Sequence, residues 1–126
     1  AVLHMSLYKN VKKSTGVEIY KSKIDEANNI VNLIGEEFKN YDKVNFINDD
    51  FNNLDNIEDY NLILINNAGI HKEVYKKIFN KMSIGTLILD MFRVTGGIAG
   101  SEVCGQIDIS CSWNKDSKIT LYKKIK

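Results

Sequence analysis

Apolar residues recur at helical spacing in two stretches of the chain. Within residues 22–40 they fall three or four positions apart, which is the spacing of one face of an α-helix. Ser22 stands at the start of this stretch, where its hydroxyl can cap a helix, and acidic residues follow in the first turns. The same spacing recurs in residues 71–83 and stops near Gly85. We therefore predict two helices, and the mixed apolar pattern of residues 1–10 indicates part of another.

Short continuous apolar runs predict strands that are buried on both faces of a sheet. A turn is expected at residues 13–16, ahead of the first run. After the fourth run, a glycine-rich loop leads to two alternating segments that are typical of an antiparallel hairpin. The order of elements predicts an α/β fold with a mostly parallel sheet and a terminal hairpin. The four runs are 17–20, 44–47, 62–65 and 86–89, and the alternating segments are 106–111 and 118–122.

Length and composition favour one domain across residues 1–126. The chain is 44% apolar and carries a formal net charge of only +1. It contains no apolar run of about 20 residues, so we expect no membrane partner and an intracellular location, cytoplasmic or nuclear. The two cysteines show no metal-ligand spacing with the two histidines, and no metal is expected.

The balance of charges predicts no strong binding of nucleic acid by this segment. Lysine is dispersed along the chain, and the C-terminal tail is locally basic, where we expect the lysines on a solvated strand face. They are Lys118, Lys123, Lys124 and Lys126.

Polar residues follow three of the predicted strands. Glu18 lies in the last part of the first strand. Asp49 and Asp50 come after the second strand, and Asn66 and Asn67 come directly after the third. In open α/β sheets, ligands bind at the carboxyl ends of parallel strands, and an acid at such an end accepts hydrogen bonds from ribose hydroxyls. An acid in this position is also common as a solvated turn residue. Three polar ends in sequence favour a ligand site.

Four short motifs resemble one family. They are Gly16-Val17-Glu18, Asn48-Asp49-Asp50-Phe51, Leu64-Ile65-Asn66-Asn67 and Ser110-Cys111-Ser112-Trp113. Their order and spacing are similar to those of the disruptor-of-telomeric-silencing class of lysine methyltransferases, which are non-SET histone methyltransferases with a seven-strand fold. The resemblance covers about the whole chain. It implies a Rossmann-like, class I methyltransferase that uses S-adenosylmethionine to methylate a lysine of a protein substrate such as a histone.

The resemblance also implies roles for individual residues. Glu18 would hold the ribose hydroxyls, Asp50 would accept the adenine amino group, and Phe51 would pack on the adenine ring. Asn66 and Asn67 end the third strand, and Asn67 would line the passage where the methyl group meets the amine. The candidates for the wall of that channel are Trp113 and Tyr122, although core packing is the commoner role of such residues.

The chain departs from the family in two places. Asp49 replaces the glycine of the family's Gly-Asp-Phe turn. The family's first strand and glycine-rich loop have no counterpart, and Ala1-Val2-Leu3 resembles the helix that directly follows that loop. We therefore expect a partial catalytic domain without its central strand, in which this segment alone lacks part of the cofactor site.

Three other functions remain open. A class I methyltransferase acting on a small molecule would have the same motifs. Short-chain dehydrogenases also have an Asn-Asn-Ala-Gly segment like residues 66–69 and a Tyr-x-x-x-Lys spacing like that of Tyr122 and Lys126. Their catalytic pair needs one helix face, however, whereas residues 119–122 alternate like a strand. The third alternative is a binding module or inactive remnant without catalysis.

Overall fold

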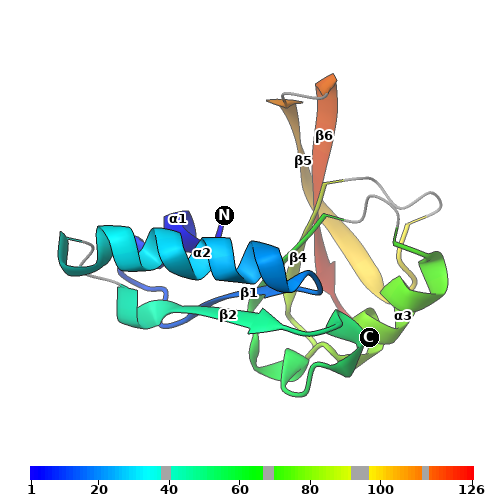
Figure 1. The fold of residues 1–126 in the computed structure, drawn as a ribbon. Helices are drawn as coiled ribbons and strands as arrows, with labels where there is room; N and C mark the ends of the chain where they lie inside the picture. The colour runs from blue at the N-terminus through cyan, green and yellow to red at the C-terminus, as the bar shows by residue number, and fades with distance from the viewer. Residues whose placement is uncertain (38–40, 67–69, 92–96, 112–113) are drawn as a thin grey trace. The chain divides into compact units, whose positions relative to one another are not determined.

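A computed structural model describes the chain in five stretches and divides it into two compact units (Figure 1). Unit 1 is Ala1–Leu54 and unit 2 is Asp55–Lys126, and each is described below by itself. The single domain expected across both remains a prediction. The described residues are 1–37, 41–66, 70–91, 97–111 and 114–126.

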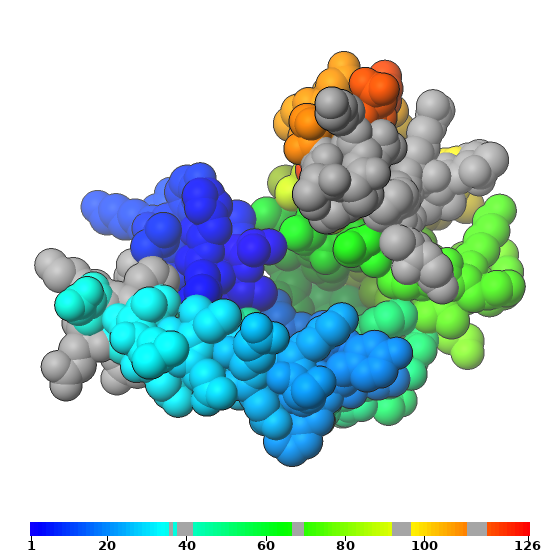
Figure 2. Space-filling view, turned by 45° about the horizontal axis from the view of Figure 1, so that its top comes forward, coloured from blue at the N-terminus to red at the C-terminus, as the bar shows by residue number. Residues whose placement is uncertain are grey.

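Unit 1 is built on two parallel strands. Strand β1 pairs with β2 from Ser14 opposite Val44 to Glu18 opposite Asn48. Helix α2 connects them and lies at the surface of the unit, so that only Ile24 among its side chains is buried (Figure 2). The elements are α1 (Val2–Ser6), β1 (Ser14–Glu18), α2 (Lys21–Ile34) and β2 (Val44–Asn48), with short 3₁₀ turns at Gly35–Glu37, Tyr41–Lys43 and Phe51–Asn53.

The structure corrects two boundaries that were predicted in unit 1. Residues 14–16 belong to β1 rather than to a turn, because they pair along β2 although they are small or polar. Helix α2 begins one residue before Ser22, and its N-cap is Tyr20, without a side-chain cap hydrogen bond. The helix ends at Ile34, and residues 38–40 of the predicted stretch lie outside the described residues.

Gly16 lies where α1 and β2 pack closely on β1. A Cβ atom there would lie 2.9 Å from Phe46 Cδ1 and 3.0 Å from Val2 Cγ2. Nearby, the Ser14 hydroxyl donates to the Val2 carbonyl at 2.8 Å, which holds α1 against the strand. Glycine at position 16 therefore allows a close packing that a larger residue would disturb.

We expect Gly16→Ala to lower the free energy of unfolding by about 1 to 3 kcal/mol, because the added methyl group overpacks this contact. Urea unfolding followed by circular dichroism measures the change. Gly35→Ala is the matched control, since a Cβ at Gly35 meets nothing within 4 Å. Equal losses in the two variants would show that packing at Gly16 is not the cause.

Unit 2 contains a four-stranded mixed sheet in the order β3-β4-β6-β5. Strands β3 and β4 are parallel, whereas β4–β6 and β5–β6 are antiparallel. The segment before β5 turns through Gly97 and Gly100, whose positive φ angles of 72° and 85° favour glycine. The elements are β3 (Leu62–Ile65), α3 (Lys72–Lys81), β4 (Leu87–Asp90), β5 (Ser101–Cys111) and β6 (Asn114–Lys124), with a 3₁₀ turn at Ile57–Asp59.

One face of this sheet packs against α3 and forms the core of unit 2. Ile88 on β4 and Tyr122 on β6 are paired and only 0% and 2% exposed. The same face carries polar side chains that are also buried, among them Asp90, Thr120 and Lys124. The prediction of a fully solvated lysine tail is therefore wrong at Lys124, because its side chain crosses to the end of α3.

The α/β fold with parallel strand pairs and a terminal antiparallel hairpin is confirmed. The hairpin strands are longer than predicted, since β5 begins at Ser101 and β6 extends to Lys124. Within the described stretches, no helix is long and apolar enough to span a bilayer.

Candidate functional site

The carboxyl ends of β1 and β2 bring acidic residues together in unit 1. Glu18 is the last residue of β1 and lies opposite Asn48, the last residue of β2, and Asp49 and Asp50 follow directly. This arrangement follows from the parallel register, since parallel strands end at the same edge of a sheet. The edge therefore presents Glu18 beside the turn that contains Asp50.

The Glu18 carboxylate is held by its own chain. The backbone N–H of Tyr20 donates to Glu18 Oε1 at 3.0 Å, and Lys23 Nζ lies 3.7 Å from Oε2. The Tyr20 hydrogen bond, and then the charge of Lys23, lower the pKa of Glu18 below its ordinary value. The lowered pKa keeps the carboxylate ionised near neutral pH. Its side chain is 32% exposed, so it is also accessible to a hydroxyl donor.

Asn48 joins the ends of the two strands. Its Nδ2 donates to the carbonyl of Glu18 at 3.0 Å and to that of Ile19 at 2.9 Å. These two bonds fix the chain as it leaves β1, and with it the position of the Glu18 side chain. No role was predicted for Asn48, although a polar residue at a strand end is a visible signal in the sequence.

The acids after β2 shape a tight turn. Asp49 Oδ1 accepts from the backbone N–H of Asp50 at 2.7 Å and from Asn53 Nδ2 at 3.1 Å. Asp50 Oδ1 accepts both the backbone N–H and the side-chain amide of Asn52, at 2.9 Å and 2.8 Å. Asp50 thereby caps the 3₁₀ turn that begins at the half-buried Phe51. Both of these bonds use Oδ1 of Asp50.

The remaining predicted site residues belong to unit 2. Asn66 is exposed directly after β3, and Tyr122 is buried in the core opposite Ile88. Asn67 and Trp113 lie outside the described residues. The cofactor-binding role of Asn66 and the roles of Asn67, Trp113 and Tyr122 in the methyl-transfer channel remain predictions. Among the described residues, no group of histidine, cysteine or acidic side chains could hold a metal ion.

No protein-family model and no curated protein sequence matches this chain. Solved structures do resemble it. An RNA methyltransferase from Salinibacter ruber, in complex with S-adenosyl-L-homocysteine, superposes with a TM-score of 0.72 at 16% identity, over 98% of this chain and 72% of that one. An rRNA methylase from Streptococcus thermophilus gives 0.62 at 15% identity, over 91% and 75%.

A third similar structure is MtNAS, solved in complex with MTA and tNA. It has a TM-score of 0.63 at 16% identity, and the match covers 87% of this chain and 43% of that one. At such identities the likeness defines the fold. The chain therefore has the Rossmann-like fold of class I methyltransferases.

Proposed function

We propose that the chain binds S-adenosylmethionine and forms part of a methyltransferase. The observation that carries this proposal is the ionised Glu18 carboxylate at the end of β1, beside the Asp50 turn at the end of the neighbouring parallel strand. This is the position from which an acid accepts ribose hydroxyls in open α/β sheets. Support also comes from the similar Salinibacter ruber structure, which was solved with S-adenosyl-L-homocysteine.

The residues of unit 1 suit the nucleoside part of this cofactor. Glu18 would accept hydrogen bonds from the ribose hydroxyls, Asp50 Oδ2 would accept the adenine amino group, and Phe51 would pack on the ring. The cofactor supplies an activated methyl group on a sulfonium. Transfer of that group is an in-line displacement, so the protein mainly has to position the acceptor. The family resemblance gives this positioning role to Asn67.

The methyl acceptor has three candidates. The family resemblance favours a lysine of a protein substrate, such as a histone. Similar structures favour RNA, since two of them are an RNA methyltransferase and an rRNA methylase. A small-molecule acceptor is also compatible with the fold.

Calorimetry with S-adenosyl-L-homocysteine tests the proposed cofactor, with NAD as the comparison. We expect saturable binding of S-adenosyl-L-homocysteine. Binding of NAD alone would favour the dehydrogenase, and binding of neither would favour an inactive remnant.

The acceptor is tested with labelled S-adenosylmethionine offered together with histones, RNA and a small-molecule extract. A label on protein would support the lysine proposal, and Asn67→Ala should then abolish labelling while cofactor binding is retained. Label on RNA alone, or on small molecules alone, would exclude the lysine while leaving the methyltransferase intact.

A further inference from the structure

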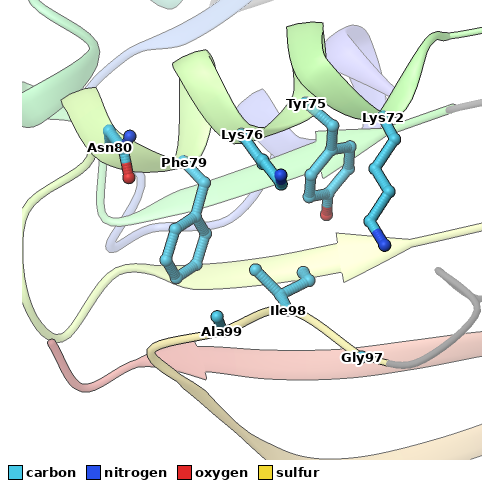
Figure 3. A pocket seen from close by; sticks show the side chains of 8 residues that line it. All are labelled: Lys72, Tyr75, Lys76, Phe79, Asn80, Gly97, Ile98 and Ala99. Carbon is cyan, nitrogen blue, oxygen red and sulfur yellow. The ribbon is translucent and has the colours of Figure 1, made fainter.

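A pocket opens within unit 2 between α3 and the segment that precedes β5 (Figure 3). Its volume is about 300 Å³, at the lower end of the range for sites that bind small ligands. Ile98 and Ala99 form its apolar side, and α3 supplies the polar one. The lining residues on α3 are Lys72, Tyr75, Lys76, Phe79 and Asn80.

The polar groups that line this pocket include two cations and no carboxylate. Lys72, Lys76 and Asn80 are each four positions apart, so they form one row along α3 with about 6 Å between neighbours. Lys76 pairs with Glu73 at 3.0 Å, but both side chains are more than half exposed, and such surface pairs contribute little. Lys72 has no ion pair among the described residues. Both ammonium groups are therefore available to an anion.

Tyr75 gives a second, independent sign of a ligand. Its side chain is only 4% exposed, yet its hydroxyl has no hydrogen-bond partner among the described residues. A buried hydroxyl without a partner is costly and uncommon. Figure 3 shows this hydroxyl and the Lys72 ammonium pointing from α3 toward the segment 97–99. Burial, and then the charge of Asp90, raise the pKa of Tyr75, so the hydroxyl stays protonated and can donate.

Helix α3 as a whole is positively charged, like the lysines that line the pocket. Among its ten residues, α3 has four lysines and one glutamate. No strong nucleic-acid binding was predicted from the formal net charge of +1. That value is a sum over the whole chain and does not reveal the local excess of positive charge on α3. Grooves that follow a single nucleic-acid strand are lined by positive charge along the phosphate backbone, and this row of cations on α3 fits that part of the pattern.

We propose that this pocket binds a phosphate of a single-stranded RNA, with Lys72 and Lys76 as the cationic contacts and the Tyr75 hydroxyl as a donor. The assignment rests on the proposed function, because it makes the pocket a subsite for an RNA methyl acceptor. An acidic peptide is the competing anion, and the test below includes it.

The double variant Lys72→Ala/Lys76→Ala should bind RNA about tenfold more weakly. The probe is a fluorescein-labelled single-stranded RNA 20-mer, whose anisotropy is measured with the full chain across a range of salt concentrations. Loss of this phosphate contact should also reduce the slope of log K against log salt by about 0.7. The matched control is Lys12→Ala/Lys13→Ala, which removes the same charge from exposed positions in unit 1.

Tyr75→Phe separates the pocket from a general basic surface. We expect weaker RNA binding, by about threefold or more, with thermal stability unchanged or raised because an unpartnered hydroxyl is removed. Three results would overturn the proposal: equal losses in the control variant, unchanged RNA binding in Tyr75→Phe, or binding of a poly-glutamate peptide as tight as that of RNA. Calorimetry of the unaltered chain with S-adenosyl-L-homocysteine tests the proposed function separately.

Discussion

Replacing Glu18 with alanine is expected to weaken binding of S-adenosyl-L-homocysteine by about 1 to 3 kcal/mol, or about five- to 150-fold. The reason is that the ribose hydroxyls would lose a charged acceptor that the chain already holds in place. Tyr20 and Lys23 restrain the carboxylate before any ligand arrives, so little ordering opposes binding. Calorimetry with the full chain measures the affinity.

Two controls make this result specific. Glu26→Ala removes the same charge from an exposed position on α2 and should leave the affinity unchanged. Glu18→Gln keeps the shape of the side chain but replaces one charged oxygen with a donor, so it should lose part of the affinity. Unchanged affinity in Glu18→Ala would show that Glu18 does not bind the ribose hydroxyls.

The pKa of Glu18 gives the expected pH dependence of this contact. Because that pKa is lowered in the folded chain, the carboxylate remains ionised through the range in which an ordinary glutamate gains its proton. The contribution of Glu18 to affinity should therefore persist at mildly acidic pH. It should disappear only when the pH falls through the lowered pKa.

Hydrophobic patterning was sufficient to place two strands of the fold. Leu62–Ile65 was predicted with its exact bounds, and Val44–Asn48 with one residue fewer. The apolar run gives the extent of such a strand but not its burial, since Leu62 and Leu64 of β3 are exposed and only Ile65 is buried. Strand β1 was placed too late, because its first residues are serine, threonine and glycine. These residues form a strand because β2 pairs with them and α1 packs closely on Gly16.

The candidate site shows the same division between local and tertiary information. The proximity of Glu18 and Asp50 follows from the rule that parallel strands end at one edge. The bridge from Asn48 to the carbonyls of Glu18 and Ile19 depends on the register between β1 and β2, which the sequence does not specify. The α3 pocket was missed for a similar reason. Its lysines look like an ordinary solvated helix face until Ile98 and Ala99 are placed opposite them.

Lys124 illustrates how a charged tail residue can become part of a core. Its Nζ donates to the carbonyls of Phe79, Asn80 and Met82 at 2.8, 3.2 and 2.6 Å, and it lies 5.0 Å from the centre of the Phe79 ring. These carbonyls belong to the C-terminal end of α3, where the helix leaves acceptors unpaired and its dipole favours a cation. The lysine therefore ties β6 to the helix.

We expect Lys124→Ala to lower the free energy of unfolding by about 3 kcal/mol, because it leaves several carbonyls without their charged donor and creates a gap beneath α3. Lys124→Met separates the two causes, since it retains the methylene chain and removes the three hydrogen bonds. If the hydrogen bonds dominate, Lys124→Met should lower the free energy of unfolding by most of the amount that Lys124→Ala does. Lys123→Ala, at the exposed neighbouring position, should change stability by less than about 0.5 kcal/mol. Urea unfolding of the three variants measures these differences, and a methionine variant as stable as the unaltered chain would assign the stabilisation to packing alone.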